Sequence, residues 1–362
     1  MPGNSMKTQA AIVRNTNEEF SIEEVDLADP RNGEVRVKIE ACGICRSDLS
    51  ALEGKEVIEF PAVLGHEATG TVDAVGKGVV RLKEGDKVIL SWTPACGCCP
   101  GCLRGQVHLC REINMTTHRR GPLSQGGQGI DRFMGLGAFC EHVVIPERMA
   151  IPVTTSLPPH QTCLIGCAVT TGFGAAVNTA AVRWGETVAV LGCGGVGLSA
   201  IQGAKVAGAS RIIAVDPIAE RREAARAMGA TDVLTAENVS VEIPKLAADG
   251  VDCAIECVGN VNTMRTCFEL IRPGGRAIVV GLPGYADELT IPAINLLAEK
   301  TLSGSIYGSC QPNTDFQKIL SLSEAGEFKL GALVDKIRPF SEINQGFDEM
   351  RQGHLTRVVL VF

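Results

Sequence analysis

A chain of 362 residues is long for a single hydrophobic core, so two domains are expected. The composition, 45% hydrophobic and 21% charged, is that of a soluble globular protein. A net charge of −7 without any basic cluster, and no apolar run near the roughly 18 residues of a membrane span, exclude a nucleic acid or a membrane as the expected partner. The N-terminal residues lack the apolar core of a signal peptide, which predicts a cytoplasmic protein.

Residues 1 to about 165 contain short, broken segments separated by glycine-rich turns and clusters of cysteine. Residues 34–40 alternate between polar and apolar side chains, the pattern of a half-buried strand. We therefore expect the first part of the chain to fold as an irregular, mostly β domain.

Near Thr170 the pattern changes to apolar strands that alternate with helices. Residues 187–191 are continuously apolar, as in a strand buried on both faces, and a glycine turn and a helix follow. The same pattern predicts further strands at residues 211–216, 251–256 and 276–281. This alternation is typical of an α/β fold with a parallel, doubly wound sheet.

After about residue 309 the sequence becomes mixed again, and it ends in an apolar strand at residues 357–362. We therefore predict a dinucleotide-binding domain of residues 169–308, inserted between two parts of the first domain, 1–168 and 309–362.

A glycine-rich turn at residues 192–197 fits the G-x-G-x-x-G pattern, follows a buried strand and opens a helix. Its glycines are Gly192, Gly194, Gly195 and Gly197. They would let the backbone approach a pyrophosphate at the positive helix N-terminus. Asp216 ends the next strand, where a carboxylate would accept from both adenosine ribose hydroxyls and repel a 2′-phosphate. NAD is therefore preferred to NADP, although Arg221 and Arg222 lie nearby; a glycine turn of an unrelated sheet is the alternative.

Fifteen cysteines are an unusual number, and an odd number cannot all form disulfides. Metal binding is the better interpretation where the spacing is regular. One loop has the spacing C-x2-C-x2-C-x7-C, formed by Cys96, Cys99, Cys102 and Cys110. Four thiolates make a closed tetrahedral site that suits a structural zinc ion, with an iron–sulfur cluster as the less favoured alternative. Cys98 is a fifth thiol in this loop and leaves one ambiguity in the assignment.

A second candidate set is Cys45, His66 and Cys167, which lie far apart in the chain. Two thiolates and one imidazole would leave a fourth position of a catalytic zinc ion open. Taken singly, each residue is more often part of a hydrophobic core than a ligand. Residues 65–79, however, have the spacing G-H-E-x2-G-x5-G-x2-V, which resembles the signature of zinc-containing alcohol dehydrogenases of the medium-chain dehydrogenase/reductase superfamily.

The resemblance extends over essentially the whole chain, because the four-cysteine loop, the Cys167 segment, the dinucleotide turn and the C-terminal strand follow in the same order. It implies a GroES-like, mostly β catalytic domain with an inserted Rossmann domain. It also implies two zinc ions and NAD as cofactors, and association into a homodimer or homotetramer through the dinucleotide domains.

Individual roles follow from the resemblance. Arg46 and Arg357 would bind the diphosphate, Ser47 would pass on the substrate proton, Asp48 would orient His66, and Glu67 would lie near the metal. Thr171 and Val196 would pack on the nicotinamide ring. The substrate pocket would include Trp92, Phe139, Leu282 and Ile306. The implied activity is reversible hydride transfer between a primary or secondary alcohol and NAD, giving an aldehyde or ketone.

Two positions depart from the family pattern. Many relatives end the proton relay with a histidine where this chain has Ser50. Thiol-dependent formaldehyde dehydrogenases of the family use an arginine that here corresponds to Asn114, which disfavours oxidation of an S-hydroxymethyl adduct but leaves it as the alternative function. A non-catalytic nucleotide-binding protein on the same fold is the remote alternative.

Overall fold

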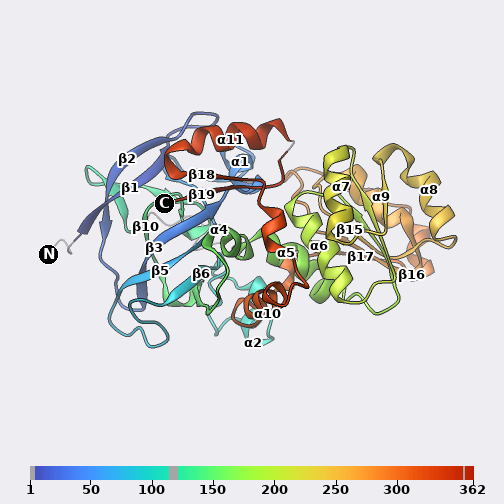
Figure 1. The fold of residues 1–362 in the computed structure, drawn as a ribbon, viewed down its shortest axis with the longest axis horizontal. Coiled ribbons are helices and arrows are strands. Elements are labelled where there is room, and N and C mark those ends of the chain that lie inside the picture. Colours follow the sequence, from blue (N-terminus) through green and yellow to red (C-terminus); the bar gives the residue numbers. More distant parts are fainter. Residues whose placement is uncertain (1–4, 114–120, 354) are drawn as a thin grey trace. The chain divides into compact units, whose positions relative to one another are not determined.

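The computed structural model describes residues 5–113, 121–353 and 355–362 (Figure 1). The chain divides into two compact units. The first comprises Met1–Cys167, Gln311–Ala325 and Leu330–Phe362, and the second comprises Ala168–Cys310 and Gly326–Lys329. The domain boundaries expected from the sequence stay a prediction, and residues 326–329 group with the second compact unit.

The first unit is rich in β-structure. Its strands are β1 (Ser5–Val13), β2 (Ser21–Ala28), β3 (Glu34–Gly43), β4 (Ala62–Val63), β5 (Glu67–Val75), β6 (Lys87–Leu90), β7 (Leu123–Gln125), β8 (Gln128–Gly129), β9 (Asp131–Arg132), β10 (His142–Pro146), β11 (Ala150–Pro152), β18 (Lys336–Pro339) and β19 (Val358–Val361). Its α-helices among the described residues are α1 (Arg46–Leu52), α2 (Pro100–Leu103), α4 (Pro159–Thr162), α10 (Pro312–Glu324) and α11 (Ile343–Gln352). The strands form one sheet in the order β8-β7-β2-β1-β4-β9 and a second in the order β11-β6-β5-β3-β19-β18, with β10 also paired to β3.

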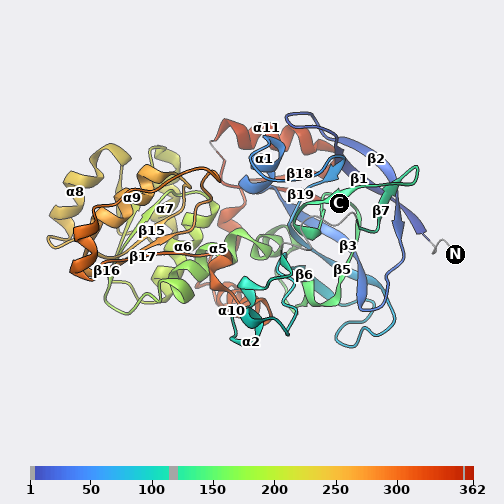
Figure 2. The ribbon, with the colours of Figure 1, turned by 180° about the vertical axis from the view of Figure 1, so that it is seen from behind.

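Strand β3 is the centre of the second sheet. Side chains in its first half alternate between half-buried and buried, as the polar–apolar alternation of residues 34–40 predicts. Its last residue, Gly43, pairs with Glu67 of β5 on one side and with Val359 of β19 on the other. Three distant parts of the sequence therefore meet at the end of β3, and Figures 1 and 2 show α11 lying along β18 and β19 beside them.

The second unit contains a parallel sheet with the strand order β14-β13-β12-β15-β16-β17. The strands are β12 (Thr187–Leu191), β13 (Arg211–Val215), β14 (Asp232–Leu234), β15 (Val251–Glu256), β16 (Ile271–Val279) and β17 (Thr301–Gly304). Its described α-helices are α5 (Ala168–Gly174), α6 (Gly195–Val206), α7 (Ala219–Met228), α8 (Val239–Leu246) and α9 (Val261–Leu270). The fold class predicted from the alternating strands and helices is confirmed.

The apolar strands of this sheet are buried because helices cover them. A cluster of buried residues joins the central strands to α8 and α9 through side chains such as Ile213, Ile243 and Phe268. Helix α7, which follows β13, ends where Gly229 takes a positive φ of 116°. The strand expected at residues 276–281 begins earlier, at Ile271.

Within the described parts of the chain, no single helix is long and apolar enough to cross a membrane. One bent pair, Pro159–Gly166 with Ala168–Thr179, meets the same test of length and composition only when its two helices are taken together.

Candidate metal and dinucleotide sites

Four buried side chains of the first unit meet beyond the end of β3. One ligand atom each from Cys45, His66, Glu67 and Cys167 lies within 4.8 Å of the others. The sheet pairing explains why, since Cys45 follows Gly43 by two residues and Glu67 is the partner of Gly43 in β5. A side chain at Gly43 would be only 2.5 Å from Oε2 of Glu67, so glycine lets the Glu67 carboxylate lie against the end of β3. Topology thus brings together the residues that the sequence places far apart.

Asp48 organises this cluster from the first turn of α1. Its Oδ2 accepts from the backbone N–H of Cys45 at 2.9 Å, and its Oδ1 accepts from Gly65 N at 2.9 Å and lies 3.0 Å from Nδ1 of His66. Cys45 is the N-cap residue of α1 and Asp48 is at position N3, so these bonds also begin the helix. The expected placement of Asp48 behind His66 is what the structure shows.

The other nitrogen of His66, Nε2, is buried and has no hydrogen-bond partner among the described residues. A buried polar atom of this kind is costly unless something binds it. Nε2 belongs to the same compact group as the sulfurs of Cys45 and Cys167. The two thiols and the imidazole therefore fit a zinc ion, with Nδ1 held by a carboxylate as metal-binding histidines usually are.

Charged neighbours shift the pKa values of two members of this cluster. A hydrogen bond with Cys167 lowers the pKa of Cys45 well below that of an ordinary thiol, and the charges of Arg357 and His66 lower it further. Burial opposes protonation of His66, but the negative charges of Asp48 and Cys45 outweigh burial and raise its pKa well above the usual value. The deprotonated form of Cys45, which these neighbours favour, is the form of a thiol that binds a metal ion.

Glu67 and Arg357 form an ion pair next to this cluster. Nη2 of Arg357 lies 3.4 Å from Oε1 of Glu67, and both side chains are almost fully buried. Nη1 of Arg357 donates to the carbonyl of Ile44 at 3.0 Å. Burial raises the pKa of Glu67 to about 8, although the charge of Arg357 opposes this. Arg357 thus lies beside the cluster of Cys45, His66 and Cys167. Arg46, which was also expected to bind the diphosphate, is exposed on α1.

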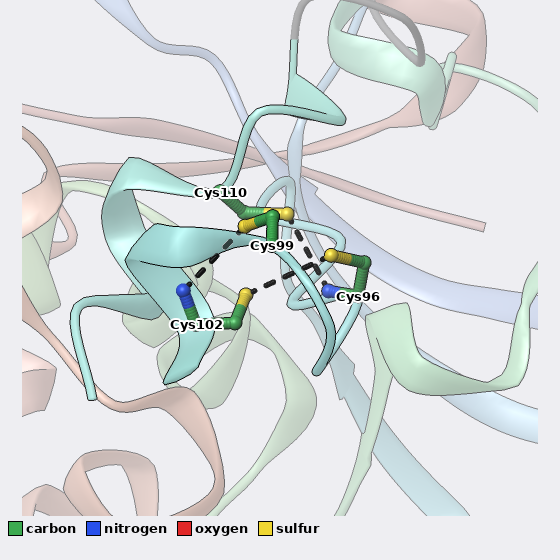
Figure 3. Close-up of side chains that lie close together, drawn as sticks. All are labelled: Cys96, Cys99, Cys102 and Cys110. Atoms are coloured by element: carbon green, nitrogen blue, oxygen red, sulfur yellow. Dashed lines mark hydrogen bonds between the residues drawn. The ribbon is translucent and has the colours of Figure 1, made fainter. Parts of the chain in front are cut away.

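The cysteine loop forms a second compact group (Figure 3). The sulfurs of Cys96, Cys99, Cys102 and Cys110 all lie within 4.8 Å of one another. Backbone N–H groups support two of them, from Cys96 to Cys110 Sγ at 3.4 Å and from Cys102 to Cys99 Sγ at 3.5 Å. Hydrogen bonds from the backbone of Cys102 and Arg111 lower the pKa of Cys99 to about 6. Four clustered thiols, one readily ionised, fit a closed zinc site.

Cys98 is not a member of this group. It is exposed, and its sulfur lies 3.7 Å from that of Cys96 alone among the described cysteines of the loop. Cys96, Cys99, Cys102 and Cys110 are the described cysteines of the loop whose sulfurs lie together. All fifteen cysteines of the chain are free of disulfides.

The glycine-rich turn lies at the carboxyl end of β12. Gly192 has a φ of 92°, and a side chain at Gly197 would be 1.8 Å from the carbonyl oxygen of Gly192, so the turn is too tight for other residues. A side chain at Gly194, by contrast, would meet no atom within 4 Å. Gly194 is the N-cap of α6, where N–H groups remain unpaired by the helix. This open cradle at a helix N-terminus fits a pyrophosphate.

Asp216 is buried just beyond β13 and braces the same turn. Its Oδ2 accepts from Cys193 N at 2.8 Å, and its Oδ1 accepts from Ile218 N at 2.9 Å. Arg221 Nη1 lies 3.9 Å from Oδ2, while Arg222 donates to the carbonyl of Asp216 at 2.7 Å. Thr171 and Val196 lie on α5 and α6, which pack so closely that a side chain at Gly172 would lie 2.0 Å from the Val196 carbonyl oxygen.

Comparison with known proteins shows the family to which the chain belongs. A family model described as alcohol dehydrogenase GroES-like domain matches residues 31–155, and one described as zinc-binding dehydrogenase matches residues 195–325. The structure of an alcohol dehydrogenase zinc-binding domain protein from Burkholderia ambifaria is 31% identical, with 99% of this chain and 100% of that chain covered and a TM-score of 0.95. The chain belongs to the zinc-containing alcohol dehydrogenase family.

Two other members of the family bear on its chemistry. Benzyl alcohol dehydrogenase from Acinetobacter calcoaceticus is 30% identical, with 99% of each chain covered and a TM-score of 0.94. A zinc-binding dehydrogenase from Sinorhizobium meliloti, whose structure has NADP bound, is 25% identical, with 99% of this chain and 100% of that chain covered and a TM-score of 0.82. Membership in the zinc-containing alcohol dehydrogenases confirms the resemblance predicted from residues 65–79.

The residues expected to line a substrate pocket differ in burial and belong to both units. Phe139 is fully buried, with its ring packed edge-on against Phe20 and Phe347. Trp92 is 8% exposed just beyond β6. Leu282 and Ile306 belong to the second unit, where 59% and 44% of their surfaces are exposed.

An aromatic contact to the metal cluster comes from a residue that we had not predicted. The ring of Phe133 packs edge-on against His66, with ring centroids 5.5 Å apart. Phe133 lies in a short 3-10 helix, Phe133–Gly135, within an irregular segment that gives no periodic signal. Asn114, which bears on the formaldehyde alternative, lies outside the described residues.

Proposed function

We propose that this protein is an NAD-dependent zinc alcohol dehydrogenase that interconverts primary or secondary alcohols with aldehydes or ketones. The observation that carries the proposal is the buried cluster of Cys45, His66 and Cys167, whose ligand atoms lie within 4.8 Å while His66 Nε2 has no other partner among the described residues. Three protein ligands leave the fourth position of a tetrahedral ion for substrate. The relative that is a benzyl alcohol dehydrogenase supports an alcohol as substrate.

Zinc bound by these residues would lower the pKa of an alcohol hydroxyl, and NAD would accept the hydride. The chain supplies the proton path. Ser47 is half-buried, and its hydroxyl lies 3.8 Å from the sulfur of Cys45, so it can take up the alcohol proton and pass it towards solvent or the cofactor ribose. Asp48 keeps the His66 ring in a fixed tautomer and orientation by its contact with Nδ1.

The choice of NAD over NADP is supported by the buried carboxylate of Asp216. A phosphate on the ribose would come close to this negative charge, and Arg222 cannot readily compensate because it already donates to the carbonyls of Asp216 and Pro217. Arg221 is the remaining nearby cation, 3.9 Å from the Asp216 carboxylate. Because one relative binds NADP, both cofactors belong in the test.

A panel of benzyl alcohol and short primary and secondary alcohols, assayed with NAD and with NADP at one pH, tests the proposal directly. We expect alcohol-dependent formation of NADH to be at least about tenfold faster than that of NADPH. The reason is that NADP would lose one good ionic or hydrogen-bonding contact with Asp216. Formaldehyde with and without glutathione or mycothiol forms the second arm. A rate that requires the thiol, and no rate with simple alcohols, would replace this proposal with the S-hydroxymethyl adduct dehydrogenase. No turnover with any substrate would leave a non-catalytic nucleotide-binding protein.

We further propose that the protein works in the cytoplasm as a homodimer or homotetramer. Fifteen free cysteines are in keeping with a reducing compartment. Strand β17 is an edge strand of the second unit, and exposed apolar side chains precede it, with Ile294 69% and Leu297 81% exposed. Light scattering should show a dimer or larger assembly that Leu297→Asp dissociates. The matched control Val80→Asp, at an exposed residue of the first unit, should not change the mass.

A further inference from the structure

Glu256 is a buried carboxylate at the carboxyl end of β15. It is fully buried, and its Oε1 accepts from Val258 N at 3.0 Å, Gly259 N at 2.8 Å and Thr263 Oγ1 at 2.6 Å. Its Oε2 is also buried and has no hydrogen-bond partner in the described part of the chain. Burying a charge is costly, so a buried carboxylate whose Oε1 accepts two backbone N–H groups of one turn calls for a reason.

That turn lies where the strand order of the sheet reverses. From β12 the chain proceeds outwards to β13 and β14, then returns to β15 on the other side of β12 and proceeds to β16 and β17. In an open parallel sheet, ligands bind beside the carboxyl ends of the two strands at such a reversal, here β12 and β15. Glu256 is the last residue of one of these strands.

Three turns at this edge are packed against one another without room for side chains. A side chain at Gly192 would lie 2.7 Å from Cγ2 of Val258, and one at Gly281 would lie 2.0 Å from Gly259 N. The carbonyl of Glu256 accepts from Val280 N at 2.9 Å and from Gly281 N at 3.0 Å. Glu256 therefore fixes the turn after β15 with its side chain and the turn after β16 with its backbone.

The two halves of a bound dinucleotide would lie on opposite sides of β12. A pyrophosphate in the cradle at Gly194 and an adenosine ribose at Asp216, beyond β13, direct the nicotinamide half towards β15 and β16. On that side, the turns held by Glu256 present Val258 and Leu282, which are 53% and 59% exposed. An apolar ring can pack on these side chains only if both turns keep their positions.

We propose that Glu256 is a positioning residue for the nicotinamide half of the dinucleotide. It acts through the two turns and does not touch the cofactor. This inference rests on the proposed function, because it requires a nicotinamide dinucleotide at this edge. The negative charge also lies at the N-terminal end of α9, where the helix dipole stabilises it.

The test compares two ligands of the purified full-length protein, NADH and ADP-ribose, which lacks the nicotinamide ring. Glu256→Gln keeps the size of the side chain but replaces a charged acceptor by a weaker neutral one. We expect the Kd for NADH to rise about tenfold and the Kd for ADP-ribose to change less than about twofold, where tenfold corresponds to about 1.4 kcal/mol.

The matched control is Asp252→Asn, at the opposite end of β15. Asp252 also joins neighbouring strands, accepting from Thr187 N at 2.8 Å and Arg272 Nε at 2.7 Å, but it lies away from the carboxyl edge. It should lower the melting temperature without changing either Kd. If Glu256→Gln does not fold, Thr263→Val removes one donor to Oε1 and should weaken NADH alone, by about threefold.

The positioning role would be overturned if Glu256→Gln and Thr263→Val leave the Kd for NADH unchanged. It would also be overturned if they weaken the binding of NADH and of ADP-ribose equally. A wild-type protein that binds neither ligand would instead overturn the proposed dinucleotide function, and with it this inference. The two failures are distinguished by the wild-type measurement alone.

Discussion

Residues 96–110 supply every member of the four-cysteine group, whereas the buried group draws Cys45, His66 and Cys167 from three distant segments. The loop needs only its own turns, since Cys99 caps the short helix α2 and backbone N–H groups of the same loop support its sulfurs. The buried group depends on the central sheet, because β3 and β5 must pair before its residues meet. A substitution in the cysteine loop should therefore affect the loop itself. A substitution in the buried group should affect the reaction, because this group lies at the centre of the fold.

Burial adds to this contrast. His66, Glu67 and Asp48 are fully buried, so the removal of one charged partner leaves the others uncompensated. Cys96 and Cys102 are partly exposed, so water can solvate the thiol groups that remain when one cysteine of the loop is removed. Substitutions in the buried group should therefore abolish activity, and substitutions in the loop should reduce stability.

The largest effect is expected for Cys167→Ser. A serine hydroxyl is a poor zinc ligand, so the zinc content should fall from about two ions per chain to about one, and kcat/KM should fall about a thousandfold or more. Metal analysis and steady-state kinetics measure both. The control is Cys163→Ala, at a buried cysteine whose thiol donates to the carbonyl of His160 and which is not among the four clustered side chains. Unaltered zinc content and activity in Cys167→Ser would show that the buried group is not the reactive site.

Asp48→Asn should have the next largest effect. An amide cannot accept from Cys45 N, Gly65 N and His66 Nδ1 together, so one of these groups loses its partner. Zinc affinity at the buried group should fall about ten- to a hundredfold, seen as faster loss of metal and activity to a chelator. Asp131→Asn is the control, because Asp131 is also buried and accepts from backbone N–H groups but does not contact the cluster. Equal chelator resistance in both variants would contradict the role of Asp48.

The same contrast explains how much could be predicted from the sequence. The cysteine loop and the glycine turn were predictable because spacing within a short segment determines their geometry. The parallel sheet was predictable because its buried strands are mostly apolar and alternate with helices. The buried group could be recognised only through the family signature, since spacing does not say that Gly43 pairs with both Glu67 and Val359.

Contacts made by single side chains were beyond prediction. Phe133 next to His66 and Glu256 in its turn depend on packing in three dimensions, and neither belongs to a periodic pattern or a motif. The position of Phe139 inside an aromatic cluster likewise follows from the approach of Phe20 and Phe347, which are far away in sequence.

A smaller effect, confined to stability, is expected for Cys99→Ser in the loop. Loss of one of four thiolates should release the structural zinc and lower the melting temperature by about 5–10 °C, because a few kcal/mol shift the midpoint by that amount in a chain of this size. Activity at 25 °C should stay within about twofold of the wild type. Cys98→Ser is the matched control in the same loop and should change neither property. A thousandfold loss of activity in Cys99→Ser would contradict the assignment of stability to the cysteine loop and of activity to the buried group.

The smallest effect is expected for Ser50→His. Ser47 and Ser50 are three residues apart on α1 and therefore lie on the same side of the helix, one turn apart. An imidazole with a pKa near 6.5 at position 50 could take over the proton that Ser47 passes on, a step that water otherwise completes. The rate just below neutral pH should rise about threefold, and the gain should disappear at high pH, where hydroxide accepts the proton directly. The pH–rate profile from 6 to 10 measures this, with Ser50→Ala as the control that adds no proton acceptor. An identical profile for Ser50→His and the wild type would mean that the relay does not pass through this side of α1, and that the reactivity of the buried group depends on Ser47 and solvent alone.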